Sequence, residues 1–193
     1  LEYVNTTFRQ ITDGFIKENL GMLHKAEETM RRKRDELKNC RRKEMVGFRR
    51  IDPEVAMEKN TWFHLGRNSC EEILYCLRRI ADPCEEHVDN NFVPLSKEQV
   101  KEYIPLRDTV LFLLRRTEKI LQTDSYDEVD DVRREAEELK DCLEKAREAQ
   151  MQRMQSSKEN ITVAYLYLNL LQETRELTSS LRHLLRASKG FRE

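Results

Sequence analysis

The chain has 193 residues, of which 38% are hydrophobic and 37% are charged, whereas an average globular protein has roughly 25% charged residues. Only five Gly and four Pro are present, too few for a sheet protein with frequent hairpins, so the composition predicts an all-α bundle of a few long antiparallel helices. The formal net charge of −1 argues against a general nucleic-acid-binding protein, which usually carries a clear basic excess.

The first predicted helix covers residues 6–45, because apolar side chains recur there at helical spacings of three, four, seven or eight residues. Its C-terminal half is strongly basic. Residues 47–53 interrupt the pattern. Asp52 followed by Pro53 is a favourable N-cap and first-turn pair, so we expect a second helix to begin there.

The second helix is expected to extend to about Asn90 and has a broad apolar stripe, which suits a central position in the bundle. Pro83 lies within it and predicts either a kink or a helix restart with Asp82 as the cap. A third helix follows, and Ser96 with Gln99 forms a capping box at its start.

The fourth helix has a narrow heptad-like seam and a charged remaining face, which is typical of a peripheral helix. The fifth, over about residues 158–188, has a strong apolar stripe and folds back on the fourth. Tyr165 and Tyr167 cannot both face inward, so the outward one is a candidate partner surface. Helices three to five predict a three-helix bundle, with the first two alongside it or in a second, incomplete bundle. The fourth-helix seam consists of Val129, Val132, Ala136, Leu139, Leu143 and Ala146.

The cysteines are odd in number and form no CxxC motif, so neither a zinc site nor a disulfide framework is expected, and we interpret them as reduced, mostly buried thiols. No apolar run reaches the ~18 residues of a membrane-spanning helix, and no signal peptide is recognised. The chain begins with Leu1 and not with Met, which indicates a fragment of a longer protein. The cysteines are Cys40, Cys70, Cys76, Cys84 and Cys142.

Charge is unevenly distributed along the chain. Residues 31–50 contain ten Lys or Arg and three acids, whereas residues 124–148 contain eleven acids and five Lys or Arg. One interpretation is that these are solvated faces that partly neutralise each other across the bundle. The other is a basic patch for anionic phospholipid or phosphate, where each basic residue near a membrane contributes about 1 kcal/mol.

Catalytic motifs are absent from the sequence. None of the four histidines lies in an ExxH or HExxH pattern, which argues against a ferritin-like di-iron centre and against a metalloprotease. No GxxxxGK[ST], GxGxxG or GxSxG is present, so phosphate loops and nucleophile elbows are not expected either. We therefore predict that the chain is not an enzyme.

The densest polar cluster lies at residues 82–91, where two acid pairs are spaced i to i+4. Each pair could present two oxygens on one helix face to a divalent cation or to iron. The alternative is an exposed polar helix end. A metal would need further ligands from a second helix, and two acids of the last helix are the best-placed donors. The candidate ligands are Asp82, Glu85, Glu86, Asp89, Glu173 and Glu176.

Two stretches carry a resemblance to a known family: LRRIADPCEEHVDNNF at residues 77–92 and AYLYLNLLQETRELTSSLRHLLRASKGF at residues 164–191. They resemble the PhoU-like cytoplasmic domain at the C-terminus of bacterial sodium/phosphate cotransporter-family membrane proteins. The resemblance implies two three-helix bundles, each with an E/DxxxD motif that binds iron or other metal ions, and a role in regulating phosphate uptake.

Both metal motifs of that family are incomplete in this chain. Asp82 matches the final aspartate of the first motif, but Arg78 occupies the first acidic position. Glu173 could open the second motif, but the residue four positions later is Leu177. A regulatory or scaffolding role is therefore favoured over a metal-dependent one.

We therefore expect a PhoU-like regulatory domain divided into residues 1–94 and 95–193. The resemblance implies that it is cytoplasmic, tethered to the inner membrane through an upstream transmembrane domain, and in contact with the transporter region of the same protein or with a second copy of itself. One alternative is a free-standing adaptor that docks partner helices through the seams of the fourth and fifth helices. The other is a metal-binding protein with its site around Asp82 and Glu86.

Overall fold

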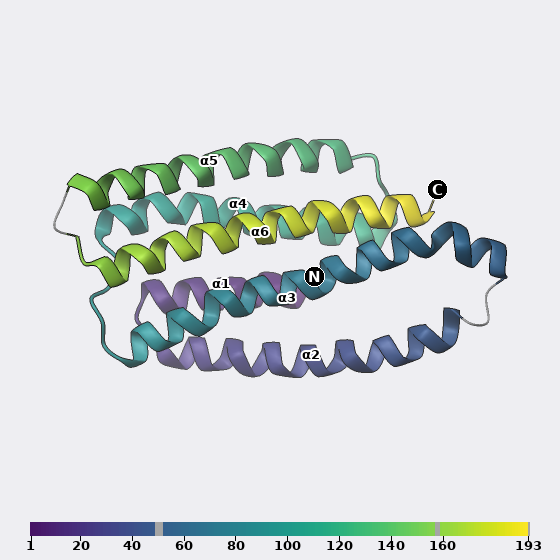
Figure 1. Ribbon diagram of the computed structural model, residues 1–193, viewed down its shortest axis with the longest axis horizontal. Helices are drawn as coiled ribbons and strands as arrows, with labels where there is room; N and C mark the ends of the chain where they lie inside the picture. Colours follow the sequence, from purple (N-terminus) through teal and green to yellow (C-terminus); the bar gives the residue numbers. More distant parts are fainter. Residues whose placement is uncertain (49–51, 157–158, 193) are drawn as a thin grey trace.

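The computed structural model describes residues 1–48, 52–156 and 159–192, and these residues form six α-helices and no strand. The helices lie along the long axis of an elongated molecule (Figure 1). The predicted all-α bundle is confirmed, although the described residues form six helices and not five. Their bounds are Glu2–Ile16 (α1), Leu20–Phe48 (α2), Pro53–Asp89 (α3), Lys97–Thr123 (α4), Val129–Ser156 (α5) and Ile161–Arg192 (α6).

The helices pack in two groups. Helices α1, α2 and α3 contact one another pairwise, and so do α4, α5 and α6. The groups are joined by α1 against α4 and by α3 against α6, which is the most extensive pairing among the described helices. Buried apolar side chains of all these helices form one connected cluster. This core is continuous across both groups of helices. The division into residues 1–94 and 95–193 stays a prediction.

The single helix predicted over residues 6–45 is wrong, because this part of the chain divides into α1 and α2. Between them Glu18 has a φ of 51°, and the side chain of Asn19 accepts a hydrogen bond from the backbone N–H of Met22. A Cβ at Gly14 would lie 3.0 Å from Cγ of Leu23, so glycine permits the close approach of the two helices. The apolar spacing concealed the break because both helices bury their stripes in one core.

Helix α3 continues through Pro83, so the predicted restart with Asp82 as a cap is wrong. Proline supplies no N–H for the carbonyl four residues earlier, which belongs to Arg79. The side-chain amide of Asn169 in α6 donates to that carbonyl at 3.1 Å. The carbonyl left without its helical partner is thus hydrogen-bonded by the neighbouring helix, and α3 needs no second start.

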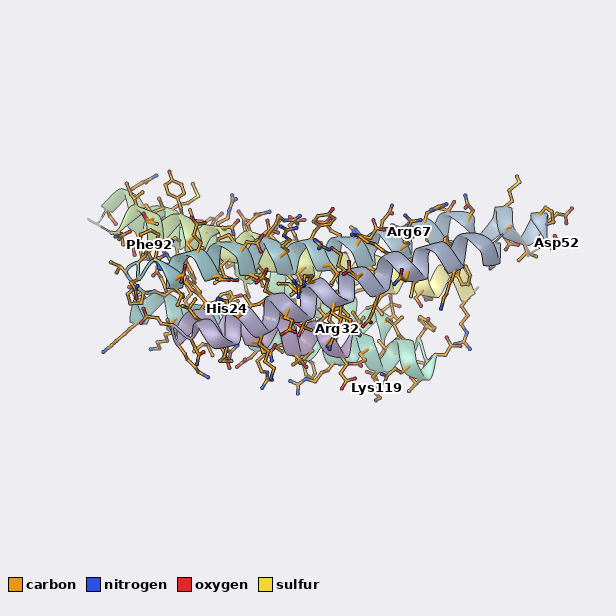
Figure 2. The ribbon with its side chains drawn as sticks, turned by 90° about the horizontal axis from the view of Figure 1, so that it is seen from below. His24, Arg32, Asp52, Arg67, Phe92 and Lys119 are labelled. Carbon is orange, nitrogen blue, oxygen red and sulfur yellow. The ribbon has the colours of Figure 1, made fainter. Side chains whose placement is uncertain are left out.

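The two predicted caps are confirmed. The carboxylate of Asp52 accepts a hydrogen bond from the N–H of Glu54 at 2.9 Å, with Pro53 at the first helical position of α3. Ser96 and Gln99 form the reciprocal capping box of α4. The α2 and α3 ends nearest Asp52 extend beyond the other helices, with Asp52 at the far tip (Figure 2).

The last two helices follow the sequence pattern closely. All six residues of the predicted α5 seam are buried. Helix α6 begins at Ile161, and the earlier start predicted at Lys158 lies outside the described residues. The outward tyrosine is Tyr165, which is 62% exposed, whereas Tyr167 is fully buried. The hydroxyl of Tyr167 donates to the carboxylate of Glu102 in α4, so its burial leaves no polar group unpaired.

The cysteines are less buried than predicted. Cys76 and Cys84 are buried, but Cys40 and Cys142 are exposed and Cys70 is half-buried.

Within the described residues, no helix has both the length and the apolar character required to cross a membrane.

Candidate functional site

Four of the six acids predicted as candidate metal ligands lie together at the C-terminal end of α3. They surround a shallow, open hollow, and the second helix at this hollow is α2 and not α6, because Glu27 of α2 also lines it. The expected donors from α6 do not reach this place. The hollow is lined by Glu27, Asp82, Glu85, Glu86, Asp89 and Asn90.

Glu85 is a partly buried carboxyl in this hollow, and its pKa is raised. Partial burial is the main reason that its pKa is raised, and the negative charge of Glu27 raises it further. His24 of α2 opposes the shift, because its Nε2 lies 3.3 Å from the Glu85 carboxylate. Burial and the neighbouring carboxylates of Glu27, Asp82 and Asp89 thus disfavour the charged form of Glu85 more than His24 favours it.

Asp82 has a cation partner of its own. Its carboxylate accepts a hydrogen bond from Nε of Arg78 at 3.0 Å, one turn away on the same exposed helix face. Arg78 and Asp82, which the resemblance assigned to the first metal motif, thus form an ion pair and not a pair of acids. This pair supplies one carboxylate and its counter-ion, and no second oxygen ligand.

Glu173 lies elsewhere, at the contact between α6 and α3. Its side chain is 11% exposed and accepts a hydrogen bond from Arg79 at 2.7 Å. The same guanidinium donates to Glu72 at 2.7 Å, and these carboxylates raise the pKa of Arg79. Arg79 therefore supplies the positive charge between two acids from different helices.

The neighbouring polar groups of this contact are also engaged. Glu176 accepts a hydrogen bond from Gln172 at 2.9 Å. Burial raises the pKa of Cys76 to about 12 despite the nearby charge of Arg79. Because a thiol rather than a thiolate is present at neutral pH, Cys76 is a poor nucleophile and a poor metal ligand.

No three His, Cys, Asp or Glu side chains in the described part of the chain are arranged so that they could hold a metal ion. The structure brings Asp82, Glu85, Glu86 and Asp89 together but leaves Glu173 apart. A metal role for these five residues stays a prediction, and two of them, Asp82 and Glu173, accept hydrogen bonds from arginines.

An apolar groove that the sequence pattern did not indicate lies where the C-terminal end of α6 packs beside α2 and α3. Its walls include Trp62 and Phe63 of α3, Leu37 of α2, and Leu184 and Phe191 of α6. The groove depends on how α2, α3 and α6 pack together, so no local spacing in the sequence could identify it.

Arg79 was missed for a similar reason. Its partner Glu173 is 94 residues away, and α3 and α6 had to be packed before the pair could be identified. The i to i+4 spacing of Arg78 and Asp82, by contrast, was visible in the sequence and predicts an ion pair on one helix face.

Comparison of the chain with models of protein families, with curated proteins and with solved structures gives no match. The resemblance of residues 77–92 and 164–191 to PhoU-like domains therefore stays a prediction.

Proposed function

We propose that this chain is a PhoU-like regulatory or scaffolding domain linked to sodium-dependent phosphate transport, without enzymatic activity of its own. The observation that carries the proposal is where the two resembling stretches lie. Residues 77–92 belong largely to α3 and residues 164–191 to α6, the two helices that pack against each other most extensively. Such a pairing between two helical groups is what a paired three-helix-bundle domain requires.

The contacts of this helix pair support regulation without a bound metal. Arg79 joins Glu72 and Glu173, and Asn169 bonds to the backbone of α3 beside Pro83. These contacts fix α3 against α6 with groups of the protein alone. A rigid helix pair of this kind can transmit a displacement from one helical group to the other, as a scaffold or regulatory domain does.

In this proposal the domain lies in the cytoplasm and is tethered to the inner membrane by an upstream transmembrane region of the same protein. Its partner is that transmembrane region or a second copy of the domain. The exposed Tyr165 on α6 is the outward aromatic residue of the resembling stretch and supports a contact surface there.

Membrane fractionation of the full-length natural protein tests the tether. We expect antibodies against this domain to detect the full-length protein in the membrane fraction. We also expect the protein to remain in that fraction after extraction at alkaline pH. Recovery of the full-length protein in the soluble fraction would overturn the tethered role.

Photo-crosslinking in isolated membranes tests the partner. A photoreactive amino acid at Tyr165 of the full-length protein is expected to crosslink to the transmembrane region or to a second copy, and the same amino acid at the exposed Glu138 of α5 serves as the matched control. Equal crosslinking at the two positions would remove Tyr165 from the contact surface.

A free-standing helical adaptor is the second candidate, and the apolar groove beside Trp62 favours it. The α5 seam considered for docking is buried within the bundle, so it offers no free surface. Affinity purification of the full-length protein with and without Trp62→Ser distinguishes the candidates. A soluble partner lost with Trp62→Ser would favour the adaptor, whereas recovery of only further copies of the same protein in both samples would favour the regulatory domain.

A further inference from the structure

The basic segment of α2 meets α3 in a continuous groove. Two adjoining hollows between these helices share Arg34, Leu74 and Arg78 in their walls. One continues toward Lys38 and Tyr75, and the other toward Arg31, Glu27 and Asp82. Helices α2 and α3 lie side by side along this length (Figures 1 and 2).

Three of the cations come from one face of α2. Arg31, Arg34 and Lys38 are spaced three and four residues apart, so they stack along the groove. Like charges at these spacings repel one another and destabilise a helix, unless an anion lies between them. Arg78 adds a fourth cation from the α3 wall.

The central arginines have no anionic partner in the part of the chain that the structure describes. Among the described residues, Arg31 and Arg34 form neither an ion pair nor a side-chain hydrogen bond, and both are exposed. Arg34 lines both hollows and therefore lies at the centre of the groove.

The acids in the groove walls are mostly engaged with other cations. Glu71 pairs with Arg67 at 3.3 Å, and Asp82 pairs with Arg78 at 3.0 Å. Glu27 also faces the acidic hollow at the end of α3, where it raises the pKa of Glu85. Positive charge is therefore least compensated around Arg34.

We propose that this groove is a binding site for a phosphate group, in which Arg31 and Arg34 donate to the phosphate oxygens and Arg78, which is paired with Asp82, lines the opposite wall. The planar guanidinium fork matches two phosphate oxygens, whereas a lysine supplies only a point charge. Leu74 and the 57% exposed Tyr75 provide an apolar wall for the organic part of a phosphate ester. The site goes beyond the proposed function, because it requires no transporter.

A phosphate group can come from a small soluble ester or from a lipid headgroup, and two binding assays separate these sources. Isothermal titration calorimetry of the purified chain uses inorganic phosphate and glycerol 3-phosphate. Vesicle sedimentation uses phosphatidylcholine vesicles with and without phosphatidylglycerol. Binding in the first assay identifies a soluble phosphate, whereas binding only to vesicles with phosphatidylglycerol identifies the headgroup.

The variant Arg34→Gln removes the central cation, and Arg32→Gln is its matched control. Both residues are exposed arginines of α2 with no ion pair among the described residues, and Arg32 lines neither hollow. Figure 2 shows Arg32 near the middle of α2. We expect Arg34→Gln to weaken binding about tenfold or more, because a hydrogen bond to a charged group is lost, and Arg32→Gln to weaken it much less.

Circular dichroism melting curves verify that both variants remain folded. Absence of binding in both assays would overturn the proposal. Equal weakening by Arg32→Gln and Arg34→Gln would overturn it as well, because the attraction would then come from the overall charge of α2 and not from the groove.

Discussion

Asn169 of α6 replaces the backbone hydrogen bond that Pro83 removes from α3. The carbonyl of Arg79 has no backbone donor because residue 83 is proline, and the Asn169 amide donates to it at 3.1 Å. Asn169→Ala leaves this carbonyl unpaired at a partly buried helix contact. Leaving such a group unsatisfied costs about 1–3 kcal/mol, and we expect the lower end because the contact is only partly buried.

Pro83→Ala provides the test, because it restores a backbone N–H four residues after Arg79. The new N–H can donate to the carbonyl within α3, so Asn169→Ala should then cost little. We expect a coupling free energy of about 1 kcal/mol between the two sites, well above the roughly 0.3–0.5 kcal/mol scatter of independent mutations. Urea unfolding followed by circular dichroism measures it for the wild type, both single variants and the double variant.

The control is Asn68→Ala on the exposed face of α3, which removes an asparagine without affecting this contact. We expect it to be neutral or slightly stabilising, because alanine has the higher helix propensity. If Asn169→Ala cost the same in the wild-type chain and in the Pro83→Ala variant, the reasoning would be refuted, since the amide would then have a role unrelated to the missing helical bond.

Three further predictions concern other contacts. Arg79→Met should lower the free energy of unfolding in urea by about 1–3 kcal/mol, because the mostly buried carboxylate of Glu173 then has no counter-ion at this contact. Adding Glu173→Met should recover most of the loss, and no recovery would contradict the pairing. Glu85 has a raised pKa in the folded state, so its ionisation destabilises the fold as pH rises through that pKa. Glu85→Gln should therefore raise the thermal midpoint at pH 7 but not below about pH 4, where the unfolded carboxyl is also protonated; an equal effect at both pH values would contradict this. Gly190→Ala would place a Cβ 2.5 Å from the ring of Trp62. The clash should lower the free energy of unfolding by about 1–3 kcal/mol and displace the indole ring toward solvent, which shifts the tryptophan emission to longer wavelength. An unchanged emission spectrum would contradict the close contact.

The sequence was sufficient to predict most helices and their caps. Helical spacing identified the stripes of α3 to α6, and local side-chain chemistry identified the caps at Asp52 and Ser96. The break at Glu18 was missed because apolar spacing does not distinguish one long helix from two that bury their stripes in the same core. Asn19 and Gly21 on its C-terminal side were the available local signals of a turn.

The acidic hollow was predictable only in part. The spacing of Asp82, Glu85, Glu86 and Asp89 correctly indicated that they would gather at one helix end. Which second helix faces them depends on tertiary packing, and the sequence suggested α6 where the structure has Glu27 of α2. The continuation of α3 through Pro83 likewise depends on a donor from a helix distant in the sequence.

The central claim, a regulatory domain of sodium-dependent phosphate transport, is tested most directly by phosphate uptake. Radiolabelled phosphate uptake is measured in bacterial cells that lack their own phosphate transporters and produce the full-length natural protein, with or without residues 1–193. We predict uptake that requires sodium, and a response to external phosphate that is altered when these residues are deleted. Uptake that is independent of sodium, or identical with and without the domain, would contradict the claim.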